Sequence, residues 1–213
     1  MTHPQPSIVF SLCLIASGLC LAGFWILTYP FDGFAGADVV THHLFVPGQV
    51  LHLVGALMAV FGYFAIYQAT QKQAGPLAIV AVIIGVTGTS LFAADAVIAL
   101  FVFPVLAKTS PDLIEPTGAM FSGAVLTFYT ATYVTHMVGI LLLAASLAWA
   151  RAAPVTVIIA FGLGGILMNL PPMPGLHVVA IMGGSLFGLN AMAIGGSILR
   201  QRAQIKDHPE QSP

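Results

Sequence analysis

The sequence predicts an all-α integral membrane protein of six transmembrane helices with both termini in the cytoplasm. Of the 213 residues, 58% are hydrophobic and only 6% are charged, whereas roughly a quarter of the residues of a soluble domain are charged. Six apolar stretches approach or exceed the length of about 20 residues that a helix needs to cross a bilayer. The basic residues between these stretches gather on one side of the predicted membrane.

The apolar stretches end at helix-breaking or charged residues. The first ends at Pro30 and the second at Lys72, and the third begins at Pro76, a favourable residue for a first helical turn. The fourth ends at Arg151 and the sixth at Arg200. The predicted spans are residues 8–28, 49–70, 76–103, 119–150, 154–169 and 175–199.

Charge predicts the orientation, because cytoplasmic loops carry an excess of Lys and Arg. With six spans, both termini lie on one side. That side holds five of the six basic residues, Lys72, Arg151, Arg200, Arg202 and Lys206, and Lys108 stands alone on the other. We therefore predict one six-span domain over residues 1–199 and a short cytoplasmic tail over 200–213. The expected location is the cell membrane, as a multi-pass protein of the bacterial inner membrane.

Three histidines begin near-copies of one short phrase. HLVGAL starts at His52, HMVGIL at His136 and HVVAIM at His177. All three phrases fall on spans that run from the outside to the inside. One interpretation is a set of three helical-hairpin repeats, since parallel repeats occur in transporters. The other is coincidence, since the phrase is degenerate in a chain this apolar.

The same histidines lie near one level of the membrane. Counted along the helix axis, His52 and His177 lie about 5 Å below the outer surface, and His136 lies about 10 Å below it. Asp95 is about 28 Å from the inner end of the third span, which places it in the outer third as well. Ionisable side chains inside lipid are costly and mark functional sites. These four residues are therefore the predicted site.

The helices that carry these residues also carry polar and small residues at helical spacing, and such stripes should face the bundle. On the fourth span the stripe consists of Tyr129, Thr132, Tyr133 and His136. Tyr133 is therefore a second-rank member of the predicted site. His43, in the first outer loop, is another.

The first functional hypothesis is a metal or haem site that supports redox or metal-assisted chemistry. Neutral imidazole is the commonest protein ligand for metals, and histidines with a carboxylate suit zinc, copper or iron. Two facing histidines suit haem. The metal ligands would be His52, His136, His177, Asp95 and His43, and a haem or other cofactor would contact His52, His136, His177 and Tyr133.

Two other hypotheses stay open. In a small-molecule or proton-coupled transporter, Asp95 and the histidines would bind substrate or relay protons. In an accessory subunit of a larger membrane complex, the histidines would hold pigments or contact neighbouring chains. Each histidine could also simply hydrogen-bond to a neighbouring helix. The expected partners are the lipid bilayer and either further copies of this chain or a larger membrane complex.

The sequence argues against several other classes. No lysine lies inside a predicted span, so no retinal Schiff base can form there. Neither an HExxH metalloprotease motif nor a Walker or dinucleotide-binding motif is present. Six basic residues and a net charge of −1 are not the footprint of a nucleic-acid-binding surface.

Overall fold

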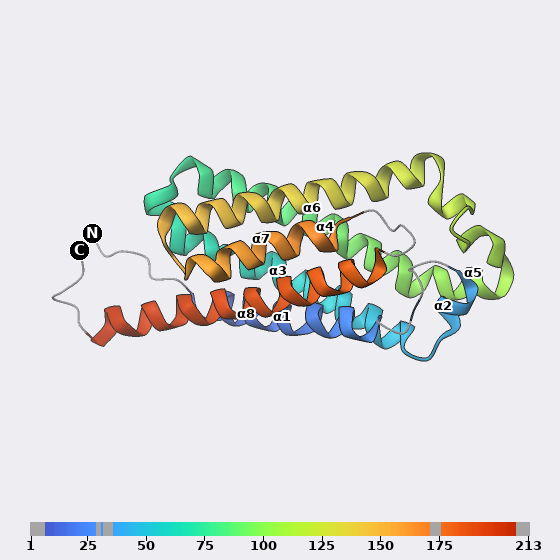
Figure 1. The fold of residues 1–213 in the computed structure, drawn as a ribbon, viewed down its shortest axis with the longest axis horizontal. Coiled ribbons are helices and arrows are strands. Elements are labelled where there is room, and N and C mark those ends of the chain that lie inside the picture. Colours follow the sequence, from blue (N-terminus) through green and yellow to red (C-terminus); the bar gives the residue numbers. More distant parts are fainter. Residues whose placement is uncertain (1–6, 29–30, 32–35, 171–175, 208–213) are drawn as a thin grey trace.

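The computed structural model describes residues 7–28, 31, 36–170 and 176–207, and these residues form helices and turns with no strand. The helices run side by side in one elongated bundle (Figure 1). The elements are α1 (Ile8–Leu27), α2 (Ala37–Thr41), α3 (Phe45–Ala74), α4 (Pro76–Phe101), α5 (Phe103–Thr109), η1 (Pro111–Ile114), η2 (Ala119–Phe121), α6 (Gly123–Ala150), α7 (Val155–Met168) and α8 (His177–Asp207). The predicted all-α fold is confirmed.

Five helical segments are long and apolar enough to cross a membrane, namely α1, α3, α4 together with α5, α6, and α8. They correspond to five of the six predicted spans, so the chain is a helical protein of the multi-pass membrane type. The remaining stretch, 154–169, forms α7, which has 14 residues. At 1.5 Å per residue α7 is about 21 Å long, shorter than a hydrocarbon core of about 30 Å. The count of six spans stays a prediction.

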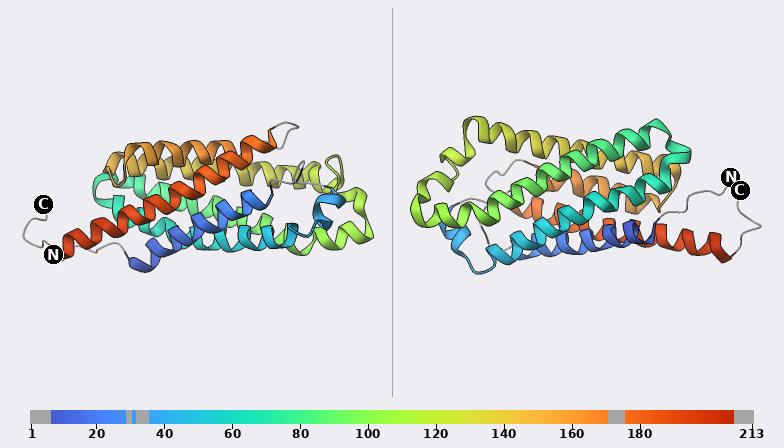
Figure 2. Two further views of the ribbon diagram at one scale, coloured as in Figure 1. Left: turned by 60° about the horizontal axis from the view of Figure 1, so that its bottom comes forward. Right: turned by 180° about the vertical axis from the view of Figure 1, so that it is seen from behind.

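The bundle helices form a closed ring in the order α1, α3, α4, α6, α7 and α8, and α8 returns to α1. Figure 2 shows α1 alongside α8. The members of each predicted hairpin, α1 with α3, α4 with α6, and α7 with α8, contact each other. In addition α3 contacts α6 across the ring. This arrangement brings together the two helices that carry His52 and His136.

Two tight turns connect helices at one end of the bundle. Gly75 ends α3 with φ +50° and ψ −122°, a conformation that glycine adopts at little steric cost, and Pro76 begins α4 at once. The turn from α6 to α7 uses Arg151 in the left-handed conformation at φ 51°. Short connections of this kind hold the neighbouring helices antiparallel and in contact.

The start of α1 and the last third of α8 lie at this same end. The backbone N–H of Ser7 donates to Gln68 Oε1 of α3 at 2.7 Å, and Gln201 Nε2 of α8 donates to the carbonyl oxygen of Ala152 at 3.1 Å. We call it the basic end because it carries Lys72, Arg151, Arg200 and Arg202. The opposite end holds α2, α5 and η1, and we call it the acidic end because it carries Asp38, Asp112 and Glu115.

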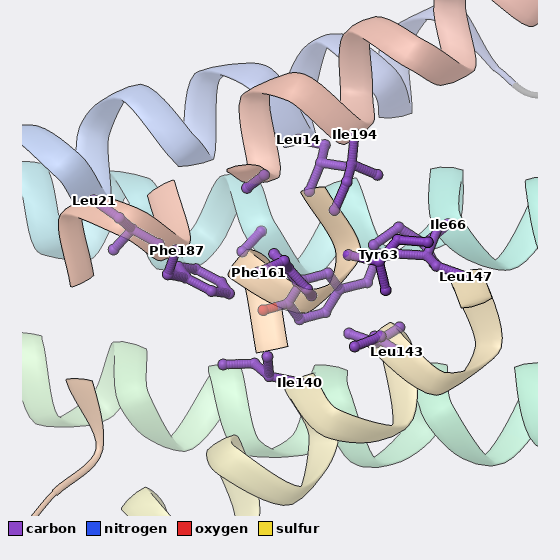
Figure 3. Close-up of a cluster of buried hydrophobic side chains, with 14 of the residues drawn as sticks. Leu14, Leu21, Tyr63, Ile66, Ile140, Leu143, Leu147, Phe161, Phe187 and Ile194 are labelled. Atoms are coloured by element: carbon purple, nitrogen blue, oxygen red, sulfur yellow. The ribbon is translucent and has the colours of Figure 1, made fainter. Parts of the chain in front are cut away.

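The main hydrophobic core fills the centre of the ring. Its largest fully buried side chains come from five helices and include Leu14, Leu21, Tyr63, Ile66, Ile140, Leu143, Leu147, Phe161, Phe187 and Ile194 (Figure 3). A second, smaller cluster lies at the acidic end, where α2 and α5 pack over the ends of α3 and α4 around Phe45 and Phe103. The acidic end is therefore closed by packed side chains rather than left as exposed helix ends.

The glycines of α8 allow close packing within the chain. A Cβ atom at Gly188 would lie 2.5 Å from the carbonyl oxygen of Gly18 in α1, and one at Gly184 would overlap the ring of Trp25. Small residues at this spacing let helix backbones approach closely. These two glycines form an intramolecular contact with α1.

Candidate functional site

One aromatic ring from each of the six bundle helices takes part in a continuous row that crosses the bundle. In order, the members are Phe24, His52, Phe92, His136, Phe187 and Phe161. The distances between successive ring centroids are 4.5, 4.3, 4.5, 6.4 and 4.8 Å, within the range where such rings attract each other. All six side chains are buried. We call this set the ring row.

His52 is fixed by its neighbours on both faces and at one ring nitrogen. Its ring stacks on Phe24 and meets Phe92 at an interplanar angle of 64°. Its Nδ1 lies 3.2 Å from Oε1 of Gln49, three residues earlier on α3. An amide oxygen only accepts hydrogen bonds, so Nδ1 carries the proton. The other nitrogen, Nε2, is buried and has no hydrogen-bond partner in the described part of the chain.

His136 is held in the same tautomer by another amide. Its Nδ1 lies 3.2 Å from Oδ1 of Asn169, which caps the end of α7. Asn169 Nδ2 donates to the carbonyl oxygen of Gly165 at 2.7 Å. That bond fixes which amide atom is the oxygen, so Nδ1 of His136 must donate. The remaining lone pair of this imidazole is on Nε2.

A glycine permits the close approach of α4 to His136. A Cβ atom at Gly88 would lie 2.5 Å from Cα and 2.6 Å from the backbone nitrogen of His136. One helical turn further along, Gly85 of α4 packs against Gly139 of α6 in the same way. Because both backbones are in contact here, α4 can place Phe92 face to face with the imidazole, at an interplanar angle of 18°.

Asp95 lies on the acidic-end side of the ring row. It follows Phe92 by three residues on α4, about 4.5 Å along the helix axis, and it is half-buried. Its carboxylate is close enough to the hydroxyls of Tyr129 and Tyr133 to interact electrostatically with both. The ring of Tyr133 also meets Phe92 edge-on at a centroid distance of 6.2 Å. Tyr133 thus contacts Phe92, the ring that packs against both buried histidines, and Asp95 follows Phe92 on the same helix.

Two hydroxyl groups of α6 in this region are buried without a hydrogen-bond partner among the described residues, namely Tyr129 Oη and Thr132 Oγ1. Both lie on the face of α6 that carries His136, at helical steps of three and four residues. Buried polar atoms without partners are rare in folded proteins and indicate an additional bound group or a chemical role. Together with His52 Nε2 they are three such atoms on two contacting helices.

His177 forms a hydrogen bond between two helices. It is the first residue of α8 and is half-buried. Its Nε2 donates to the carbonyl oxygen of Thr28, at the end of α1, with a distance of 3.1 Å. This confirms, for His177, the alternative in which a histidine joins two helices through a hydrogen bond. The proton is on Nε2, so this imidazole has the opposite tautomer to His52 and His136.

His43 lies outside this group. It is exposed at the acidic end and stacks on His42 with a ring-centroid distance of 4.4 Å. His42 in turn accepts a hydrogen bond from the backbone N–H of Leu44 at 3.2 Å and meets Phe31 edge-on. The histidine pair therefore shapes the turn between α2 and α3.

The predicted site divides into separate parts. His52, His136, Asp95 and Tyr133 share one region on α3, α4 and α6, whereas His177 and His43 have other partners. Across the residues that the structure describes, no group of three or more His, Cys, Asp or Glu side chains is placed to hold a metal ion. A metal centre with three or four of the predicted ligands is not supported.

Two further polar contacts follow the interfaces of α3 with α4 and α6 toward the basic end. Thr89 Oγ1 of α4 donates to the hydroxyl oxygen of Tyr63 at 3.3 Å. Closer to the basic end, Ser146 Oγ of α6 donates to Thr70 Oγ1 of α3 at 2.8 Å. All four side chains are buried. Hydroxyl groups thus occur at two levels below the ring row.

Sequence reasoning missed three residues of the site. Asn169 ends α7, and the structure shows that its amide also fixes the ring of His136. Phe24 and Phe92 gave no signal, because a phenylalanine at helical spacing is typical of any apolar core. Only the ring contacts on His52 and His136 identify them.

No protein-family model matches the chain, and no curated protein or solved structure is significantly similar to it.

Proposed function

We propose that this six-span membrane protein, with its basic end in the cytoplasm, binds and relays protons through His52 and His136. The observation that supports the proposal most directly is that the two buried imidazoles have the same tautomer. In each, Nδ1 donates to an amide oxygen, so the lone pair that can take up a proton is on Nε2. Histidine is the side chain whose charge changes most readily near physiological pH.

Polar groups on both sides of the ring row support a path for protons along the bundle. On the acidic-end side of the ring row are the half-buried Asp95 carboxylate and the unpartnered hydroxyl of Tyr129. Toward the basic end, the hydroxyl pairs of Tyr63 with Thr89 and of Thr70 with Ser146 continue along the same helices. Chains of ionisable and hydroxyl groups inside a bundle are typical of proton relays.

A proton fits the packing better than a shared metal ion does. Phe92 contacts both imidazoles, His52 at a centroid distance of 4.3 Å and His136 at 4.5 Å. A metal bound by both Nε2 atoms at about 2 Å from each, or a haem plane between them, would require this phenyl ring to move. Protonation of either Nε2 atom by itself requires no such space.

The test of this proposal is proton movement in proteoliposomes. After an acid pulse outside, vesicles with the native protein should acidify inside faster than protein-free vesicles, as reported by a trapped pH-sensitive dye. Asp95→Asn removes the carboxylate beside Tyr129 and Tyr133, so we expect the protein-dependent rate to fall by at least about tenfold, on the scale of lost acid–base groups.

Asp112→Asn is the matched control, because Asp112 is exposed in η1 at the acidic end. We expect this variant to move protons at the native rate. Equal rates for native and protein-free vesicles would overturn the proposal, and equal rates for the two aspartate variants would remove Asp95 from the route.

A second candidate function is the binding of zinc, copper, iron or haem by His52 and His136. The observation that favours it is the same Nδ1 contact, since metal-ligating histidines usually donate their second ring N–H to an oxygen atom and bind through the other nitrogen. Here Phe92 would have to leave its position between the ligands.

Elemental analysis of detergent-purified protein that was never exposed to nickel resin separates the two candidates. The proton relay predicts no iron, copper or zinc above background. A near-stoichiometric metal that is absent from His136→Ala would establish the second candidate instead. Metal retained in His136→Ala would place it at another site.

A further inference from the structure

An open hollow lies on the surface at the basic end, between the α3–α4 turn and the last turn of α6. It is lined by Gln73, Ala74, Gly75, Pro76, Leu77 and Trp149. The tight turn at Gly75 brings the end of α3 and the start of α4 against α6, and the side of α6 forms the opposite wall. The hollow faces outward from the bundle and is separate from the ring row.

Trp149 is unusual in this hollow. Its side chain is 72% exposed, whereas the other tryptophan of the chain, Trp25, is 4% exposed and packed in the core. Trp149 is the second-last residue of α6, at the level where the helices turn. Tryptophan is enriched at this level in membrane proteins because its ring has an apolar body and a polar N–H. An exposed indole here is positioned to contact lipid.

The charge around the hollow is positive. Lys72 precedes the lining residue Gln73 directly, Arg151 follows Trp149 by two residues, and both cations are exposed. The acidic side chains of α1 to α7 lie elsewhere, at the acidic end or, for Asp95, beside the ring row. Basic pockets on the cytoplasmic side of transmembrane helices bind anionic lipid headgroups.

We propose that this hollow binds an anionic phospholipid, with the headgroup phosphate facing Lys72 and Arg151 and an acyl chain against Leu77 and Trp149. Both parts of the ligand find a chemical match, because two exposed cations are within two residues of the lining residues Gln73 and Trp149, and the lining itself is largely apolar and aromatic. Two lysine or arginine residues at such a surface should favour an anionic over a zwitterionic headgroup by at least about fivefold.

The experiment uses Trp149 as its own reporter. Brominated lipids quench tryptophan fluorescence on contact. Buried Trp25 contributes only a background signal, which the variant Trp149→Phe measures. In bilayers that mix brominated and ordinary lipids, we expect brominated phosphatidylglycerol to quench Trp149 with at least about fivefold higher relative affinity than brominated phosphatidylcholine.

In the variant Lys72→Gln/Arg151→Asn, the two brominated lipids should quench the fluorescence of Trp149 equally. Asparagine is chosen at position 151 because it tolerates the left-handed backbone that Arg151 adopts. Lys108→Gln at the acidic end is the matched control and should keep the native preference. Unchanged quenching by phosphatidylcholine shows that a variant is still inserted. Equal quenching of the native protein by the two lipids would overturn the proposal.

Discussion

The variant His52→Phe/His136→Phe is expected to take up about one to two protons fewer per chain than the native protein when the pH falls from about 8 to about 3, an interval wide enough for imidazoles in a low-dielectric interior. Phenylalanine keeps an aromatic ring at both positions, so the stacking with Phe24 and Phe92 is preserved. The Nε2 lone pairs are lost. The measurement is a pH jump on detergent-purified protein with an indicator dye.

The rate of proton uptake distinguishes buried groups from exposed ones. Solvent-exposed groups take up protons in the fast phase that follows mixing. The loss in the double variant should fall in a slower phase, which Asp95→Asn should slow further. Proton uptake by the double variant that equals the native value in amount and rate would show that the two buried histidines do not take part.

Replacing Gly88 by alanine is expected to destabilise the bundle by about 1–3 kcal/mol, the usual cost of overpacking. The added Cβ atom would lie 2.5 Å from Cα of His136. This neighbour is backbone and cannot rotate away, so α4 and α6 must separate. The separation also moves Phe92 away from His136. We therefore expect both the stability and the proton uptake of this variant to be lower than those of the native protein. Equilibrium unfolding in mixed detergent and SDS, followed by circular dichroism, measures the effect.

Gly196→Ala is the matched control, because a Cβ atom at this position of α8 has no heavy atom within 4 Å apart from its own helix and chain neighbours. Alanine is favoured over glycine in a helix by about 1 kcal/mol, so this variant should be neutral or slightly more stable. If Gly88→Ala were as stable as Gly196→Ala, the close contact of α4 with α6 would not exist in the membrane.

The length of the apolar stretches predicted the long helices well. The first stretch, 8–28, became Ile8–Leu27, and the turn at Pro76 begins α4 as expected. The second helix is longer than predicted, Phe45–Ala74 against 49–70, since apolarity marks the part of a helix that lies in lipid and not its polar extensions. The third predicted span, 76–103, corresponds to α4, which ends at Phe101, and to the beginning of the short α5 at Phe103.

The site was only partly predictable, because helical spacing gives depth and face but not the lateral order of helices. Depth placed His52, His136 and Asp95 near one level, and in the structure both imidazoles pack against Phe92, three residues before Asp95 on α4. His177 has a comparable depth, yet α8 stands between α7 and α1 in the ring, and its imidazole meets the carbonyl of Thr28. No local pattern could show that Phe92 would separate the two buried imidazoles.

Solid-state ¹⁵N NMR of histidine-labelled protein in bilayers shows which ring nitrogens of His52 and His136 carry protons, and therefore whether their Nε2 lone pairs are available. His52→Phe and His136→Phe assign the two signals, and His177, which donates from Nε2, serves as an internal reference of opposite tautomer. We predict that both rings carry their proton on Nδ1 at about pH 8, and that at least one gains a proton on Nε2 by about pH 3. Protons on Nε2 at the higher pH, the chemical shift of a metal-bound nitrogen, or no protonation over the whole interval would show that these histidines do not take up protons through Nε2.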